Sequence, residues 1–211
     1  INRIKGRGIF GSDEKRITQG SSPELKVLEV SVEEKATSEI TAGAGIGTDG
    51  TSFMFAVSEN NWLGRGVRLR TSLNTSKESL SGGIAITNPN YNYSLKEVSG
   101  SFVVSSSDKT TNSGYNCSIT GLSLGTKFEQ YQDIFLAPNL SFSYEDIEAE
   151  STASAQMKKM EGDFTNVDFL YSVILDKRNQ PFQPTSGYRT KFAQSLPIII
   201  DSSSIAKTYL S

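Results

Sequence analysis

The feature that most restricts the fold of this sequence is a series of segments in which apolar residues alternate with polar ones. Most of these segments are about 9–12 residues long, whereas a strand of a soluble sheet usually has 5–6 residues and a tilted membrane-spanning strand needs roughly 9–11. We expect strands at 38–47, 52–60, 66–76, 80–88, 96–106, 114–124, 134–145, 164–175 and 188–196, and another that starts at 205. The pattern predicts an all-β fold of about nine or ten antiparallel up-and-down strands.

The segment 66–73 shows how the two faces of such a strand differ. Val67 and Leu69 fall on one face, whereas Arg68 and Arg70 fall on the other. An arginine that faced lipid near the middle of a bilayer would cost roughly 2–4 kcal/mol, so in a membrane barrel both arginines would point into the water-filled lumen. A soluble sheet with its apolar face turned to a protein core has the same periodicity. Periodicity leaves both interpretations open, and strand length favours the transmembrane β-barrel.

The composition argues against an enzyme and against a nucleic-acid-binding protein. The 211 residues include no histidine, which removes Ser-His-Asp and Cys-His catalysis and the commonest metal ligand. The only cysteine, Cys117, has no intrachain disulfide partner, and no cluster of acid, base and nucleophile stands out. The net charge of −2 does not indicate a surface for nucleic acid. We therefore expect no catalytic activity, no cofactor, no metal and no nucleic-acid partner.

The texture of the sequence changes near residue 37. Residues 1–36 are charged, and "ELKVLEVSVEEK" alternates Leu28, Val30 and Val32 with charged or small neighbours, which suits the tail of a small α+β module. From Thr37 onward, Gly, Ser, Thr and Asn are interleaved with apolar residues. We therefore expect two parts, 1–36 and 37–211. The connections in the second part alternate between structured, aromatic turns and polar loops, one of which, "STASAQMKKME", could form a short helix.

Two connections contain residues with a clear conformational role. In "NNWLGRG" (60–66), Gly64 and Gly66 can adopt positive φ in a tight turn, and Trp62 can lie at the level of the lipid headgroups. In "PFQPTSGY" (181–188), two prolines restrict the backbone and Gly187 precedes a strand. Both connections are expected to be rigid.

Four stretches, in this order, resemble the BamA family, whose members insert proteins into the bacterial outer membrane. They are "VSVEEKATSEITAGAGIGTDG" (30–50), similar to the end of the last periplasmic POTRA module and the first barrel strand; "NNWLGRG", similar to the turn after strand two; "AITNPNY" (85–91), similar to the turn after strand four; and "LDKRNQPFQPTSGYRTKF" (175–192), similar to the connection between strands eight and nine. The resemblance spans essentially the whole chain and implies a fragment that holds the first nine or so of an expected sixteen strands. The family's Arg-Gly-Phe loop motif and the later strands are absent.

The resemblance implies an outer-membrane protein assembly factor of a Gram-negative bacterium, with residues 1–36 in the periplasm. Unfolded outer-membrane proteins would enter through a lateral seam at the first barrel strand, and the other partners would be accessory lipoproteins and outer-membrane lipid. The seam residues carried over are Ile40, Thr41, Ala42, Gly43, Ala44, Gly45, Ile46 and Gly47. The periplasmic turn residues carried over are Trp62, Leu63, Gly64, Gly66, Asn88, Pro89, Tyr91, Asp176, Phe182, Pro184 and Gly187. Because the seam side chains are small, their cross-strand packing should be weak, and the strand could unpair at modest cost.

Other functions remain open at this point. The sister TamA family shares the Leu-x-Gly-x-Gly and Pro-x-x-Gly turns, so a translocation and assembly protein of that type, or another secretion pore with POTRA modules, is one alternative. A soluble β-sheet adhesin or binding domain is a second alternative.

Overall fold

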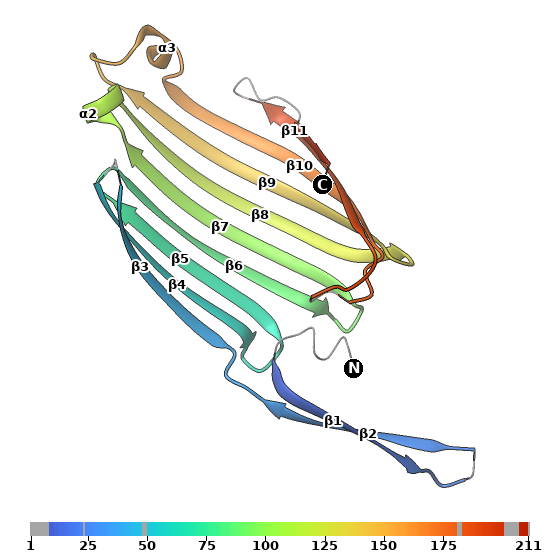
Figure 1. Cartoon of the computed structure of the whole chain (residues 1–211). Helices are drawn as coiled ribbons and strands as arrows, with labels where there is room; N and C mark the ends of the chain where they lie inside the picture. The colour runs from blue at the N-terminus through green and yellow to red at the C-terminus, as the bar shows by residue number, and fades with distance from the viewer. Residues whose placement is uncertain (1–8, 23, 48–49, 181–182, 201–206, 211) are drawn as a thin grey trace.

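The computed structural model describes residues 9–22, 24–47, 50–180, 183–200 and 207–210. Ten strands form one antiparallel sheet in which each strand pairs with its neighbour in the sequence. They are β3 (Ser38–Gly47), β4 (Gly50–Trp62), β5 (Val67–Ser76), β6 (Ser79–Tyr91), β7 (Lys96–Asp108), β8 (Tyr115–Tyr131), β9 (Ile134–Ala149), β10 (Gly162–Asp176), β11 (Arg189–Ile200) and β12 (Lys207–Leu210). Figure 1 shows them side by side in a curved sheet that runs from β3 at one edge to the C-terminal strands at the other. The predicted all-β, up-and-down fold is confirmed.

Every predicted strand is present, although the predicted start of the last one at residue 205 lies outside the described residues, and several strands are longer than predicted. β8 continues to Tyr131, beyond the predicted end at residue 124, and β9 continues to Ala149, beyond residue 145. The reason is that the two strands remain paired from Tyr115 opposite Ala149 to Tyr131 opposite Ile134, through polar stretches that alternation alone does not mark as strand.

The two ends of the sheet carry different connections. At one end lie tight turns at 63–66, 92–95 and 132–133 and the described loop segments 177–180 and 183–188. At the other end lie α2 (Thr110–Ser113) and α3 (Ala155–Lys158), as Figure 1 shows. α3 confirms the predicted short helix, and the Ser154 hydroxyl caps it by accepting a hydrogen bond from the Met157 N–H at 3.2 Å. Among the described residues, no helix has the length and apolar character needed to cross a membrane.

Before the large sheet, β1 (Phe10–Gln19) and β2 (Lys26–Glu34) form a separate antiparallel hairpin. Figure 1 places this hairpin beyond the end of the sheet that is opposite α2 and α3. The chain leaves β2 at Glu34 and enters β3 at Ser38, close to the expected division at residues 36 and 37. The assignment of residues 1–36 to a POTRA module stays a prediction.

The strand register sorts the side chains into an apolar and a polar face. One row of directly opposed residues is Val57, Thr71, Ile84, Phe102, Leu122, Phe142 and Val167. The neighbouring row, on the opposite face, is Ser58, Arg70, Ala85, Ser101, Ser123, Ser141 and Asp168. Because alternate residues of a strand point to opposite faces, the sheet is two-sided throughout.

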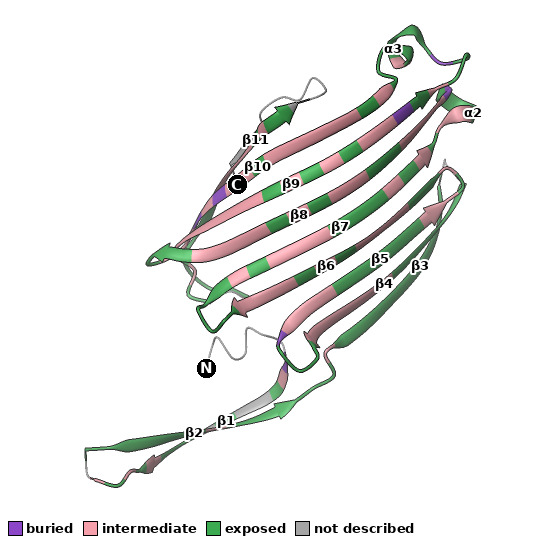
Figure 2. Ribbon diagram, turned by 180° about the vertical axis from the view of Figure 1, so that it is seen from behind, coloured by how far each residue is buried: buried purple, intermediate pink, exposed green. Residues whose placement is uncertain are grey.

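No second layer of sheet or helix covers the apolar face in the described part of the chain. Phe55, Phe102 and Phe142 remain 47%, 43% and 43% exposed, and no described side chain is completely buried. Figure 2 shows the same result, because most of the sheet is exposed or half-buried. A soluble sandwich would bury these aromatic side chains against a protein core. This sheet leaves them for contact with something other than the described chain.

Candidate functional site

The first strand of the large sheet, β3, is an open edge. It pairs with β4 on one side and with no described residue on the other. All ten of its residues are exposed. It contains the whole predicted seam segment, whose members are Ile40, Thr41, Ala42, Gly43, Ala44, Gly45, Ile46 and Gly47. Whether these residues act as a seam stays a prediction that the geometry below supports.

The hydrogen bond between Thr37 and Asn60 establishes which backbone groups of β3 are free. The Asn60 N–H donates to the Thr37 carbonyl at 3.1 Å, and the register makes these residues direct partners because Ser38 lies opposite Glu59. Hydrogen-bonded and non-hydrogen-bonded pairs alternate along an antiparallel ladder. The odd-numbered residues of β3 therefore bond to β4, and Ser38, Ile40, Ala42, Ala44 and Ile46 direct their N–H and C=O groups toward the open edge.

The beginning of β3 is fastened to β4 by one carboxylate. Glu59 accepts hydrogen bonds from the Thr37 hydroxyl at 2.5 Å, from the Ser38 hydroxyl, and from the Asn61 N–H at 2.6 Å. Further along the strand the contacts are sparse. A Cβ added at Gly43 would lie 3.7 Å from Met54 Cε, and one added at Gly47 would meet no atom within 4 Å. Since the space at Gly43 and Gly47 would accept larger side chains, glycine is not required sterically at these two positions, and its effect is to keep cross-strand packing weak.

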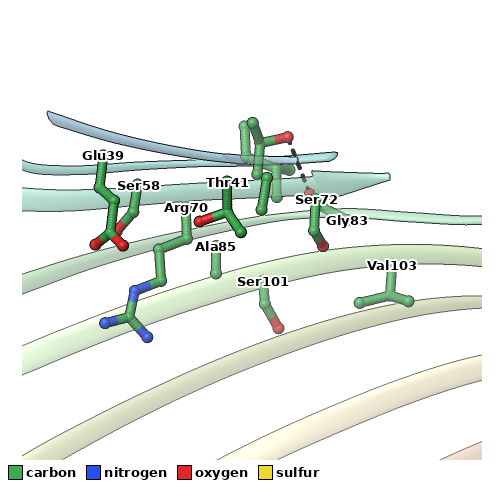
Figure 3. Close-up of a pocket in the computed structure, with 12 residues that line it drawn as sticks. Glu39, Thr41, Ser58, Arg70, Ser72, Gly83, Ala85, Ser101 and Val103 are labelled. Atoms are coloured by element: carbon green, nitrogen blue, oxygen red, sulfur yellow. Dashed lines mark hydrogen bonds between the residues drawn. The ribbon is translucent and has the colours of Figure 1, made fainter. Parts of the chain in front are cut away.

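Next to this edge, the polar face forms a shallow cavity of about 410 Å³. In Figure 3, Glu39, Ser58, Arg70 and Ser101 point to the same side of the sheet. Arg70 makes no ion pair among the described residues, whereas Arg68 donates from Nη2 to Glu97 Oε2 at 2.9 Å. The strand alternation puts both predicted arginines on this face. That the face lines a water-filled lumen stays a prediction.

The β4–β5 turn has the conformation that its glycines suggest. φ is +56° at Leu63, +68° at Gly64 and +65° at Gly66, which confirms the expectation for the two glycines. Asn61 closes the turn, because its backbone carbonyl accepts from the Gly64 N–H at 2.9 Å and its Oδ1 accepts from the Gly66 N–H at 2.7 Å.

The β6–β7 turn repeats this geometry without glycine. The Asn90 carbonyl accepts from the Tyr93 N–H at 3.2 Å, and its Oδ1 accepts from the Leu95 N–H at 2.9 Å. The positive φ values recur at the same offsets, at Asn92, Tyr93 and Leu95. The predicted turn residues Asn88, Pro89 and Tyr91 belong instead to β6, so the turn begins at Asn92. In the same way, Trp62 is the last residue of β4 and Asp176 the last residue of β10. The signal in the sequence was an asparagine six residues before the first residue of the next strand, at both Asn61 and Asn90.

Three β-bulges at this end of the sheet place aromatic side chains on the apolar face. The register shifts between Glu59 and Trp62, between Asn88 and Tyr91, and between Glu129 and Tyr131. After the shifts, Trp62 lies opposite Val67, Tyr91 opposite Lys96, and Tyr131 opposite Ile134. Each shift reverses the alternation of one strand, so that an aromatic residue joins the apolar face just before the turn. Of these three aromatic residues, only Trp62 was predicted from the sequence to lie at the edge of the apolar face, at the level of the lipid headgroups.

The β10–β11 loop is held by an ion pair and a glycine. Arg178 donates to Asp176 Oδ1 from Nε at 2.7 Å and to Oδ2 from Nη2 at 2.6 Å, and this carboxylate raises the pKa of the Arg178 guanidinium. Gly187 has a φ of +93°, and a Cβ there would lie 2.1 Å from the Lys177 carbonyl oxygen. Pro184 lies in this loop, whereas Phe182 falls outside the described residues.

Comparison with known proteins gives a family and a fold. The family model described as the Omp85 superfamily domain matches residues 61–211. No curated protein matches the sequence. Among solved structures, the chain is similar to BamA from Haemophilus ducreyi lacking POTRA domains 1–3, with a TM-score of 0.67 and 15% sequence identity. The match covers 93% of this chain and 41% of that chain, so the present sequence spans less than half of the length of this relative.

Proposed function

We propose, from the premise that this chain belongs to the Omp85 superfamily, that it assembles other β-barrel proteins into the outer membrane through the open edge of β3. Its ten-stranded sheet is part of an outer-membrane β-barrel. The proposed substrates are unfolded outer-membrane proteins, whose strands would add to β3 one at a time. Accessory lipoproteins and outer-membrane lipid are the other proposed partners.

The observation that carries this proposal is the combination of free backbone groups and weak packing in β3. Ile40, Ala42, Ala44 and Ile46 direct outward N–H and C=O groups that no described residue pairs with. An exposed edge of this kind pairs readily with an extended segment of another chain. Because the side chains are small, few side-chain contacts compete with the pairing. The stabilisation would come from backbone hydrogen bonds and from burial of the apolar face in lipid, with no catalysis and no nucleotide.

The apolar face supports the membrane part of the proposal. Along β9 it extends from Ile134 to Tyr144, a stretch that at about 3.4 Å per residue and a tilt of about 40° spans roughly 25 Å. Tyr131 and Trp62 lie at one end of this band, and the acidic residues Asp146 and Glu148 lie beyond the other. Aromatic residues at the edge of an apolar band are typical of the membrane interface. The hairpin lies beyond the aromatic end, which we propose faces the periplasm.

An assembly factor fits these features better than a passive secretion pore or a soluble adhesin. A pore that only conducts has no use for an edge strand so poor in side-chain contacts, whereas a translocation and assembly protein of the TamA type could pair with its substrate at the same edge. A soluble adhesin would not leave the apolar face of the sheet uncovered, as it is in the described part of strands β3 to β11. Conductance of the full-length protein, measured with and without a bound substrate, would help to separate assembly from passive secretion.

Cysteine crosslinking in the full-length protein tests the proposal. Thr41→Cys, in β3, should form disulfides with a terminal strand of a substrate that is stalled during assembly, with the native Cys117 replaced by serine. Ser72→Cys is the matched control, because Ser72 lies on the same face but in β5, which is paired on both sides. Absence of crosslinks from β3 in a protein that still assembles substrates would contradict the proposal.

A further inference from the structure

The side chains of β3 carry very little information about register. The strand reads "SEITAGAGIG", and Glu39 is its only charged residue. A slip of one residue would turn the polar side chains of an incoming strand toward lipid and its apolar side chains toward the polar face, which is energetically unfavourable. A slip of two residues keeps both faces and is not opposed in this way. A side chain of β3 that distinguishes registers differing by two residues would fix the alignment that lipid leaves open.

Glu39 lies at a position of β3 where its side chain would come close to a side chain of an added strand. Its backbone groups bond to β4, as do those of the other odd-numbered residues. An antiparallel strand added at the open edge would thus face Glu39 in a non-hydrogen-bonded pair. In such pairs the Cα atoms are about 4.5 Å apart and the side chains lie closer together than in hydrogen-bonded pairs.

The Glu39 carboxylate also has no partner among the described residues. No hydrogen bond or ion pair within that part of the chain involves it, and its side chain is exposed on the polar face. The nearest cation along its row is Arg70, and Ser58 on β4 lies between them, as the register and Figure 3 show. Two strand spacings, about 9.5 Å, separate the Glu39 and Arg70 backbones. Glu59, by contrast, already receives hydrogen bonds from Thr37, Ser38 and Asn61 and has less capacity for a new partner.

We infer that Glu39 selects the register of an incoming strand by pairing with a lysine or arginine side chain on that strand's polar face. This inference depends on the proposed function, because it describes how the open edge of β3 would choose its alignment. A cross-strand ion pair of this kind favours one register over its neighbours by up to about fivefold.

The test uses the full-length protein with Thr41→Cys and Cys117→Ser, and a stalled substrate with one lysine on the polar face of its terminal strand. Single cysteines along that strand report the register. If the lysine lies opposite Glu39 in an antiparallel pair, the substrate residue two positions before the lysine lies opposite residue 41. Thr41→Cys should therefore crosslink most strongly with a cysteine at that substrate position. Moving the lysine by two residues should move the strongest crosslink by two residues.

Substitutions at Glu39 complete the test. Glu39→Gln should reduce the preference for one register by up to about fivefold, and Glu39→Lys combined with a substrate Lys→Glu change should restore it. Glu29→Gln and Glu29→Lys, in the exposed hairpin, make the same changes of net charge as Glu39→Gln and Glu39→Lys and should have no effect. If crosslinks form but their positions depend neither on the lysine nor on Glu39, the proposal that Glu39 selects the register is wrong, and the proposal that substrates pair with β3 stands. If no crosslink forms at any position, both proposals fail.

Discussion

Trp62 lies opposite Val67 on the apolar face because the register between β4 and β5 shifts after Glu59. Without this bulge the alternation of β4 would turn the indole toward the polar face. Similar β-bulges bring Tyr91 and Tyr131 to the apolar face at the same end of the sheet.

Trp62 should therefore report the depth of the membrane interface. It is the only tryptophan in this sequence, so its fluorescence can be followed in lipid vesicles once any tryptophan elsewhere in the full-length protein is replaced by phenylalanine. We expect stronger quenching by lipids brominated near the headgroup than by lipids brominated at the chain ends. A Trp62→Tyr, Leu69→Trp protein is the control, and its emission should respond most to the deeper quencher. Equal quenching of Trp62 at both depths would contradict its interfacial position.

Tyr93→Gly should stabilise the protein by up to about 1 kcal/mol. Tyr93 has a φ of +56°, and a left-handed conformation costs a residue with a side chain roughly 1–2 kcal/mol, part of which glycine loses again in the unfolded chain. Its side chain is 90% exposed, so its removal sacrifices little burial. Urea unfolding in lipid vesicles measures the change. Tyr91→Gly, at a strand position with ordinary φ, should destabilise instead.

Gly187→Ala should destabilise the β10–β11 connection by about 1–3 kcal/mol. The added Cβ would lie 2.1 Å from the Lys177 carbonyl oxygen, and φ at this residue is +93°, so both the backbone and its neighbour must move. The temperature at which heating changes the electrophoretic mobility of the barrel from that of the folded to that of the unfolded protein should be lower in the variant. Gly121→Ala is the matched control, since its Cβ would make an ordinary contact at 3.8 Å with the Phe142 carbonyl oxygen.

Gly43→Val should slow substrate assembly several-fold without lowering the stability of the protein itself. Valine favours strand conformation and would add contacts with Met54, because a Cβ at this site lies 3.7 Å from Met54 Cε. The rate at which a substrate barrel becomes folded in reconstituted vesicles gives the readout. An unchanged rate with normal stability would show that weak packing in β3 is not required. Gly121→Val tests whether a similar change in an interior strand is harmless.

The alternation of small and apolar residues was sufficient to predict the sheet. β3 begins and ends at the residues expected from "SEITAGAGIG", because the apolar face is continuous there. The ends of β8 and β9 were underestimated, since their polar residues are held in strand conformation by pairing between distant segments, which a local pattern does not record.

The candidate site was only partly readable from the sequence. The glycines Gly64 and Gly66 indicated a turn with positive φ in the sequence. Asn92, Tyr93 and Leu95 also have positive φ, but no glycine indicates their turn. The bulges at Tyr91 and Tyr131 depend on the register of two strands together, so a single segment gives no sign of them. The outward direction of the backbone groups in β3 likewise became apparent only from the pairing of Thr37 with Asn60.

The attachment of β3 at both of its ends has a consequence for membrane depth. Glu59 fastens the strand at Thr37 and Ser38, and at the far end Gly47 lies opposite Gly50, to which it is joined through only two residues. The strand can bow between these attachments, but it cannot slide along β4. Each of its residues therefore keeps one height in the bilayer, and any segment that aligns with it acquires its own vertical position in the same step.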